Sequence, residues 1–482
     1  MTTCDLKSHI VDSGFYSNGY ATSEVRTIFC DIYRYQRWLD VEAALAVTQA
    51  ELGIIPEWAA EIILEKAQLK YLDLNAIREG IKTSSHSLIP LLCALRTVCP
   101  RDAGQFIHFG ATTQDIQDTA QSLEIKDVLD IVERDLVQII NRVSVLAGKY
   151  RDTVTIGRTH AQHALPMTLG LKFAVWLDEL WRNYERLQPL RERLLVSQLF
   201  GGVGTMDAFS EQGINLLAKF SEKLGLKAPN TAWHASRDRA AEFLSVMAII
   251  SGTMARIANE IRCLSRNEIG EMEEPFKMGK IGSSTMPHKR NPEMCEQAIV
   301  LARLIKSNAA LGFEAMINEH ERDYRAVRLE WVTIADSSHF ICGQLSIMKA
   351  IMEGLIIYDN TIRKNVDNAA TFISTEALMF YLGTKIGKQT AHHVVYEICM
   401  EAIESKKPVL DLLLKHPEIE GKFEREELIE TIDPGRHIGL SKELTDLTIN
   451  AVSANMQKYS PVTISERICP LKNTGGACEV KR

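Results

Sequence analysis

Apolar residues recur at alternating intervals of four and three in the middle of the chain. One series is Ile125, Leu129, Val132, Leu136, Ile139, Val143 and Leu146. A second is Phe243, Val246, Ile250, Met254, Ile257, Ile261 and Leu264. Because such intervals place side chains on one face of an α-helix, each series predicts a long helix with an apolar seam. The apolar pattern predicts two more long helices, over about 293–317 and 330–355.

The chain lacks sustained alternation of apolar and polar residues between turn signals, the pattern typical of sheets. We therefore predict an all-α fold built around a long central helix bundle. The seams could be buried within one subunit or could continue into partner subunits. Periodicity leaves both arrangements open.

Shorter predicted helices with turn signals flank the central region on both sides. At 482 residues the chain is too long for one compact core. We expect an N-terminal helical domain over 1–109, a central long-helix bundle over 110–360 and a C-terminal helical domain over 361–482.

Composition and charge exclude several classes of protein. A hydrophobic fraction of 46% is typical of a globular chain, and a net charge of −7 offers no basic surplus for nucleic acid or anionic membrane. The N-terminus lacks signal-peptide features. The chain also lacks an uninterrupted apolar run of about 18 residues, the length that a membrane-spanning helix needs. Ten scattered cysteines without a Cys-x-x-Cys pair indicate reduced thiols. We expect a cytoplasmic protein with no metal, no cofactor, no nucleic-acid partner and no membrane association.

A polar loop over Gly282–Pro292 lies between two predicted long helices. It contains Ser283, Ser284, Lys289 and Asn291. Cations and amide donors packed this closely favour a bound anion, because they otherwise repel one another. A carboxylate-binding loop is one interpretation, and a solvated basic turn is the other.

A second polar segment precedes the first long helix. Thr112, Thr113 and Gln114 stand where that helix would begin, so hydroxyls and free backbone N–H groups could hold a carboxylate. Simple helix capping by Thr113 or Asp115 is the alternative.

A third polar segment contains Thr159, His160 and His163. Histidine is the usual general acid or base near neutral pH. The two histidines could also suit a metal, but no carboxylate stands at the spacing of a zinc peptidase motif. A structural role in a polar loop remains a further alternative.

Three other segments carry weaker signals. The glycine-rich stretch 200–205 lacks the flanking features of a nucleotide loop and predicts a tight turn. The charged run 318–323, which contains Arg322, is typical of a charged helix face or helix end. His86 lies in a polar interruption and indicates little by itself.

Together these segments resemble the three signature regions of the fumarase/aspartase superfamily. Gly282–Pro292 is similar to the signature Gly-Ser-Ser-x-Met-Pro-x-Lys-x-Asn-Pro, and the resemblance covers nearly the whole chain. The chain looks most like the branch that holds adenylosuccinate lyase and 3-carboxy-cis,cis-muconate cycloisomerase. This resemblance implies a homotetramer with a twenty-helix core and active sites that are each drawn from three subunits. The resemblance therefore favours apolar helix seams that pack against partner subunits over seams that are buried within one subunit.

The resemblance also implies elimination next to a carboxylate. A base removes a proton from the carbon beside that carboxylate, and an acid protonates the leaving group on the next carbon. Ser283 matches the base, with Ser284 as the other candidate, while His160 matches the acid and Glu296 the residue that orients it. The expected substrate-binding residues are Thr112, Thr113, Gln114, Thr159, His86, Lys289, Asn291 and Arg322.

The substrate is less well defined than the reaction. Adenylosuccinate lyases carry an Arg-Tyr pair for the nucleotide phosphate, where this chain has Gly19-Tyr20. Their Ser-Ser-x-Glu-Arg stretch is also absent, although Arg325 and Arg328 could still meet an anion. We expect a di- or tricarboxylate substrate and a C–N or C–O bond.

The sequence is compatible with three functions. The first is release of fumarate or an analogue from an N-substituted aspartate. The second is lactone formation of the carboxymuconate type, and the third is an inactive helical scaffold. The intact set of matching residues argues against the third.

Overall fold

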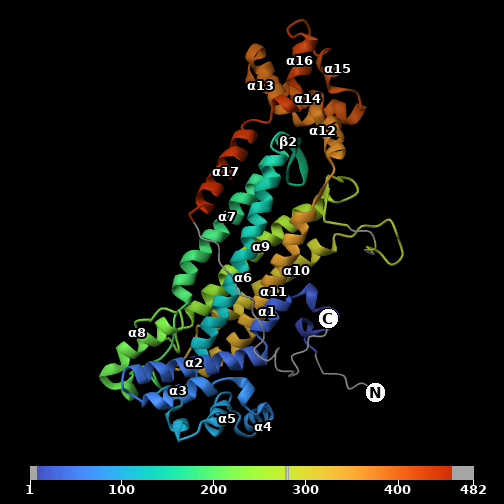
Figure 1. Ribbon diagram of the computed structural model, residues 1–482. Helices are drawn as coiled ribbons and strands as arrows, with labels where there is room; N and C mark the ends of the chain where they lie inside the picture. The colour runs from blue at the N-terminus through green and yellow to red at the C-terminus, as the bar shows by residue number, and fades with distance from the viewer. Residues whose placement is uncertain (1–7, 277–278, 280–281, 459–482) are drawn as a thin grey trace.

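The computed structural model describes residues 8–276, 279 and 282–458 of the 482-residue chain. Five long helices form the body of the molecule and lie side by side along its long axis (Figure 1). They are α6 (Thr113–Lys149), α7 (Leu169–Leu194), α9 (Asp238–Leu264), α10 (Glu293–Glu314) and α11 (Tyr324–Gly354). Every member of both predicted seams, in α6 and α9, is buried. The predicted all-α fold is confirmed.

Helix α11 begins six residues before the expected position at 330. The side chain of Asp323 accepts a hydrogen bond from the backbone N–H of Arg325 and so caps the helix. The helix-end interpretation of the charged run therefore holds for Asp323. The rest of the run is a loop between α10 and α11 rather than a helix face.

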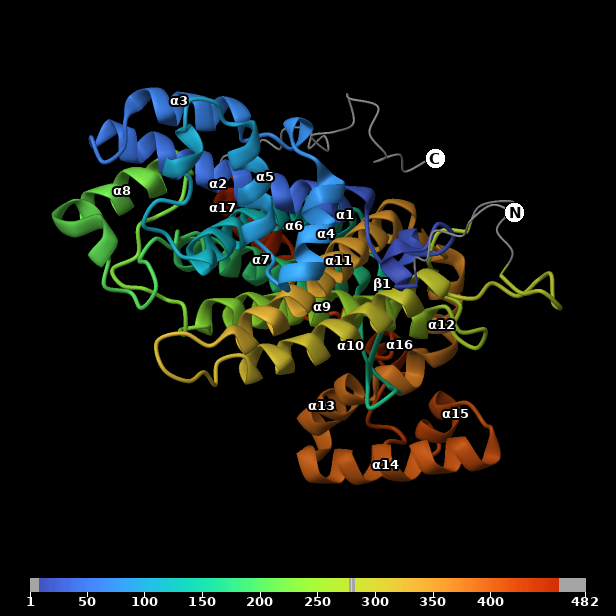
Figure 2. The same ribbon diagram turned by 90° about the horizontal axis from the view of Figure 1, so that it is seen from below.

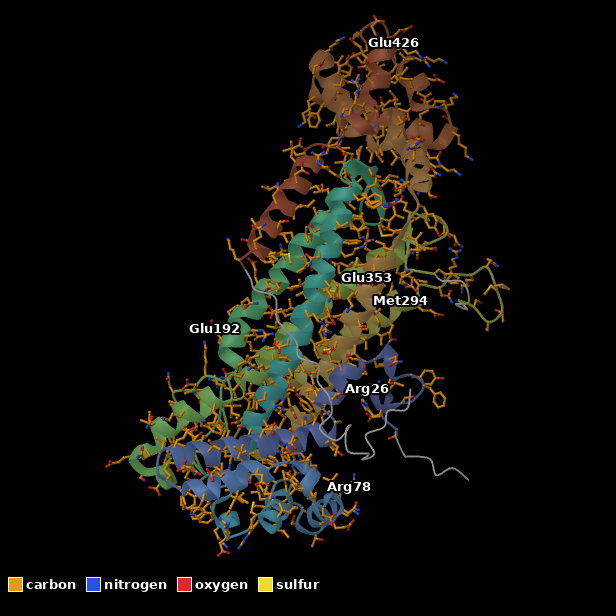
Figure 3. All side chains as sticks on the ribbon, in the orientation of Figure 1. Arg26, Arg78, Glu192, Met294, Glu353 and Glu426 are labelled. Atoms are coloured by element: carbon orange, nitrogen blue, oxygen red, sulfur yellow. The ribbon has the colours of Figure 1, made fainter. Side chains whose placement is uncertain are left out.

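Shorter helices gather at the two ends of the long-helix body (Figures 1 and 2). At one end lie α2 (Asp31–Glu51), α3 (Glu57–Lys66), α4 (Leu74–Ser84), α5 (Ile89–Val98) and α8 (Gly213–Lys223), while the short helix α1 (Ser23–Ile28) packs against α6 and α11. At the other lie α12 (Asp359–Ile373), α13 (Thr375–Ile386), α14 (Lys388–Ser405), α15 (Val409–Leu413) and α16 (Arg425–Thr431). Arg78 on α4 and Glu426 on α16 mark these two ends in Figure 3.

The last described helix, α17 (Ser441–Met456), returns to the body and packs against α7. Its Val452 joins the core of the long helices, as do N-terminal residues such as Val25 and Ile28. The central core thus recruits residues from both ends of the chain. The boundaries at 109/110 and 360/361 stay a prediction.

Helix α9 is the one described helix that is long and apolar enough to cross a membrane by length and composition alone. Its apolar residues pack against α7, α10 and α11, as those of a core helix do.

The strands in the described part of the chain form two small antiparallel pairs, and one isolated parallel bridge joins Val196 to Lys227. β1 (Val154–Thr159) pairs with β2 (Gln162–Thr168), and β3 (Met272–Glu273) pairs with β4 (Ile356–Ile357). The first pair is a hairpin whose two-residue turn is His160-Ala161, with φ of 49° and 63°. The sequence did not predict this hairpin because such turns usually carry Asn-Gly or Asp-Gly.

Six short 3-10 helices complete the described secondary structure: Ile10–Asp12, Ser17–Gly19, Leu69–Tyr71, Ala103–Phe106, Asp207–Gln212 and Pro434–Arg436. The glycine-rich stretch 200–205 is a bent loop rather than one tight turn, and it is closed by a hydrogen bond from the backbone N–H of Met206 to the carbonyl of Phe200.

Candidate active site

The first turn of α6 is held in place by one buried carboxylate. Asp115 accepts hydrogen bonds from the backbone N–H groups of Thr112, Phe200 and Gly201, at 2.9–3.0 Å. His234 Nε2 lies 3.0 Å from the same carboxylate. The predicted helix start is therefore confirmed, and Thr112 and Asp115 form a capping box there.

A cavity of about 620 Å³ opens in front of this helix start. It is lined by Ile81, Ser85, His86, Ser87, Thr112, Thr113, Gln114, Arg322, Tyr324, Arg328 and Trp331. Five predicted substrate-binding residues thus come together here from three separate parts of the chain. The described lining contains two arginines and a histidine but no carboxylate, so the cavity suits an anionic ligand.

Both threonine hydroxyls face cationic or N–H groups from other segments. Arg322 donates a hydrogen bond to Thr112 Oγ1 at 2.6 Å, and His86 Nε2 lies 3.5 Å from Thr113 Oγ1. A hydroxyl that accepts a hydrogen bond is still free to donate its own hydrogen. Thr112 and Thr113 can therefore donate to an anion in the cavity.

The ring of His86 has a defined tautomer. Its Nδ1 accepts hydrogen bonds from the backbone N–H groups of Leu88 and Ile89, at 3.2 and 3.1 Å, at the start of α5. Because Nδ1 is an acceptor, the ring hydrogen lies on Nε2, the atom nearest Thr113. His86 is thus a fixed N–H donor at the edge of the cavity.

Gln114 is placed differently from its expected role as a carboxylate ligand. Its amide nitrogen donates to Asp118 Oδ2 and to the carbonyl of His234, both at 3.0 Å. Both amide hydrogens are therefore used inside the protein. Gln114 shapes the cavity floor, but its side chain has no hydrogen left to donate to a substrate.

A buried ion cluster lies directly behind this floor. Arg237 is fully buried and donates to both carboxylate oxygens of Asp118, at 2.8 and 3.0 Å. It also donates to Glu330, at 2.6 Å to Oε1 and through a second contact to Oε2. Burial by itself would lower the pKa of Arg237, but the charges of Asp118 and Glu330 raise it above its usual value.

The cluster connects three helices, because Asp118 is on α6, Arg237 directly precedes α9 and Glu330 is on α11. It therefore fixes two walls of the cavity relative to each other. Sequence reasoning missed it. The available signal was the presence of carboxylates inside otherwise apolar helices.

The predicted carboxylate-binding loop is described from Gly282 onward. The hydroxyl of Ser283 accepts hydrogen bonds from the backbone N–H groups of Thr285 and Met286, at 3.4 and 3.1 Å. Asn291 donates to the carbonyl of Gly282 at 2.5 Å and holds the two ends of the loop together. A Cβ on Gly282 would lie 2.4 Å from the carbonyl oxygen of Lys289, so this close approach requires glycine.

The two N–H donors aimed at Ser283 Oγ would stabilise its alkoxide form, as a base in this position requires. In the described part of the chain, no such donors surround the exposed Ser284. Lys289 and Asn291 line a second cavity of about 550 Å³ beside the loop, together with His288 and Glu296.

Thr159 and His160 lie exposed at the tip of the β1–β2 hairpin. The hairpin is anchored by Arg158, which forms an ion pair with the buried Glu271 at 2.5 Å. Glu296 pairs with Arg262 at 3.5 Å. Among the described residues, no hydrogen bond joins His160 to Glu296, Ser283 or Ser284.

The length of α6 separates the predicted site residues within one subunit. This helix has 37 residues and therefore spans about 55 Å. Thr112 and Thr113 lie at its first turn, whereas the hairpin that carries His160 follows its last turn (Figure 1). These residues can contribute to one site only if they come from different copies of the chain.

A metal site is not evident in the described part of the chain, where no group of three His, Cys, Asp or Glu side chains is suitably placed.

Comparisons with known proteins agree with this architecture. A family model described as lyase matches residues 18–306, and one described as adenylosuccinate lyase C-terminus matches 371–447. The chain is 39% identical to an N-acetyl-S-(2-succino)cysteine lyase from Enterococcus italicus, over 92% of this chain and 98% of that one. It is 40% identical to an adenylosuccinate lyase from Pyrococcus horikoshii, over 90% and 96% of the two chains.

A similar solved structure is the 3-carboxy-cis,cis-muconate lactonizing enzyme from Pseudomonas putida. Its TM-score is 0.87 at 34% identity, and the match covers 92% of this chain and all of that one. The fold, the family matches and the relatives point to one conclusion. The chain is a lyase that belongs to the fumarase/aspartase superfamily, in the branch of adenylosuccinate lyase and 3-carboxy-cis,cis-muconate cycloisomerase.

Proposed function

We propose that this lyase catalyses β-elimination from a 2-substituted succinate and releases fumarate or an analogue. The observation that carries the proposal is the cation-lined cavity at the start of α6, where two threonine hydroxyls can donate to a carboxylate. The relatives named as lyases of succinyl compounds support the same reaction class.

In the proposed mechanism, the alkoxide of Ser283 removes the proton from the carbon beside one substrate carboxylate. The charge that develops on that carboxylate is held by Lys289 and by donors of the loop. The bond from the next carbon to the leaving atom then breaks, and its electron pair stays on the leaving atom. His160 supplies the proton that neutralises the leaving atom.

This mechanism needs more than one copy of the chain, because the proposed base, acid and substrate-binding threonines come from different regions. We propose the homotetramer that the resemblance implies. An apolar stripe on α10 supports assembly: Val300, Leu304 and Leu311 share one helix face and are each 37–40% exposed. In Figure 2, α10 lies at an edge of the group of long helices.

The leaving atom is proposed to be nitrogen or sulfur. Nitrogen was expected from the sequence together with oxygen, whereas sulfur enters through the relatives named for succinocysteine. Lactone formation remains the second candidate, because the lactonizing enzyme from Pseudomonas putida is a close structural match.

The ultraviolet absorbance of the new double bond gives a direct test. The purified protein is mixed separately with adenylosuccinate, argininosuccinate, S-(2-succino)cysteine and its N-acetyl derivative. We expect absorbance to rise with at least one of them. No rise with any, from protein that is correctly folded and assembled, would contradict the elimination. Conversion of 3-carboxymuconate to its lactone would instead favour the second candidate.

A further inference from the structure

One charged residue in the cavity at the start of α6 is not accounted for by the succinyl part of the proposed substrate. A succinyl group carries two carboxylates. In the proposed function, one is held by Lys289 and the loop, and the other by Thr112, Thr113 and Arg322. Arg328 lines the same cavity and is left without a role.

Arg328 lies on a face of α11 that points into the cavity. Tyr324, Arg328 and Trp331 are separated by four and three residues, so they share this face. The guanidinium of Arg328 lies 5.3 Å from the centre of the Tyr324 ring. The rings of Tyr324 and Trp331 meet edge to face at 6.0 Å. The arginine therefore lies against the Tyr324 ring, and Trp331 contributes a second aromatic ring to the same cavity wall.

Contacts with neighbouring residues hold the rings of Tyr324 and Trp331 in position. The hydroxyl of Tyr324 donates to Gln117 Oε1 at 3.3 Å, and Gln117 in turn donates to Ser87 at 2.7 Å. The ring of Trp331 lies 6.4 Å from that of Trp38 on α2. A pre-organised wall of this kind reduces the entropic cost of binding a ligand.

The charge of Arg328 has no carboxylate partner among the described residues. Arg325, one turn earlier, differs in this respect, because it pairs with Asp323 and with Glu319 at 3.2 Å. Arg325 was one of two arginines expected to meet an anion, and its partners within the chain already occupy it. Of these two arginines, Arg328 is therefore the one that can bind an anionic ligand.

We propose that Arg328 binds a carboxylate carried by the leaving group, so that the preferred substrate is a succinyl adduct with three anionic groups. The inference rests on the proposed function and specifies its substrate class. The planar guanidinium can form two parallel hydrogen bonds with a planar carboxylate. Two aromatic rings beside it leave a flat, partly apolar space for the rest of the leaving group.

Two substrate pairs that differ only in this carboxylate provide the test. One pair is S-(2-succino)cysteine and the succinyl adduct of cysteamine. The other is N-(carboxymethyl)aspartate and N-methylaspartate, in case the leaving atom is nitrogen. For each pair, kcat and KM are measured for the wild type and for the Arg328→Met, Arg328→Lys and Arg325→Met variants.

We expect the wild type to prefer the carboxylate-bearing member by roughly ten- to hundredfold in kcat/KM, the effect of one charge-assisted hydrogen-bonding contact. Arg328→Met should bring this ratio close to one, mainly through KM. Arg328→Lys should retain part of the preference, and Arg325→Met should retain all of it.

The possible failures are distinct. If the wild type cleaves both members of a pair equally well, or if Arg328→Met leaves the preference intact, the inference is overturned and the elimination stands. If Arg328 instead controls the cleavage of adenylosuccinate alone, the anion is a phosphate and the carboxylate assignment is wrong. If none of these compounds is cleaved, both the inference and the proposed function fail.

Discussion

The pair of His108 and Glu42 helps to hold the loop that leads into α6, where Gln49 also donates a hydrogen bond to the carbonyl of Phe109 at 2.7 Å. His108 Nδ1 lies 2.7 Å from Glu42 Oε1, and Glu42 is buried on α2. His108 also adopts a positive φ of 60°, an uncommon conformation for a side chain of its size. The pair therefore holds the backbone just before Thr112 and Thr113.

The same pair makes stability depend on pH. Burial by itself would lower the pKa of His108, but the neighbouring charge of Glu42 raises it above its usual value of about 6.5. A raised pKa in the folded state stabilises the protein fully below the unfolded value, and this contribution is lost as pH rises through the folded value.

We therefore predict that the free energy of unfolding decreases as pH rises above about 6.5, and that His108→Gln flattens this dependence. Denaturant unfolding at a series of pH values measures the effect. His393→Gln is the control, because His393 pairs with Glu397 on the exposed surface. An identical pH profile for wild type and His108→Gln would show that the pair contributes nothing.

The two serines of the loop are expected to differ in their effect on catalysis. Only the hydroxyl of Ser283 accepts hydrogen bonds from backbone N–H groups within the described part of the loop. We predict that Ser283→Ala lowers kcat by roughly 10²–10⁴-fold, the usual contribution of a general base, and that Ser284→Ala has a much smaller effect. Steady-state kinetics on assembled protein distinguish the two. The reverse order would assign the base to Ser284.

At the scale of elements, the connection between α6, α9 and α11 depends on Arg237. Removing one partner from a buried ion cluster leaves charges without compensation, which costs about 3–5 kcal/mol. We predict a loss of this size in the free energy of unfolding for Arg237→Met, measured by denaturant unfolding. Arg239→Met is the matched control, because Arg239 is only partly buried and its contacts among the described residues are to the carbonyl of Arg193 and the ring of Trp233, not to a carboxylate. Equal stability of the two variants would contradict the prediction.

At the scale of the whole molecule, the length of α6 makes mixed oligomers informative. If the site combines residues from different copies, one inactive variant can supply what another lacks. We predict that Ser283→Ala and Thr113→Val, each inactive alone, regain part of the activity when they are unfolded and refolded together. Activity of the mixture is compared with that of each variant refolded separately. No recovery, despite proven mixed assembly, would place both residues in one subunit's site.

Different parts of this protein could be predicted from sequence to different degrees. The seams of α6 and α9 were predictable because helix periodicity depends on residues three or four apart. The start of α6 was predictable from its capping residues for the same reason. The start of α11 was misplaced, because Asp323 lies outside the apolar pattern that indicated this helix.

Tertiary structure decided which of these local features meet. The sequence identified Thr112, Thr113, His86 and Arg322 as candidates, but only packing brought them around one cavity. Packing also directs both amide hydrogens of Gln114 to Asp118 and His234. It pairs Arg325 with Asp323 and Glu319, whereas Arg328 has no carboxylate partner among the described residues. These outcomes depend on contacts between residues far apart in the chain, such as the ion pairs of Arg237 with Asp118 and Glu330. The sequence alone determined the long helices and the set of polar groups that the loop carries, because both are local. The geometry of the cavity is long-range, and only the folded chain determined it.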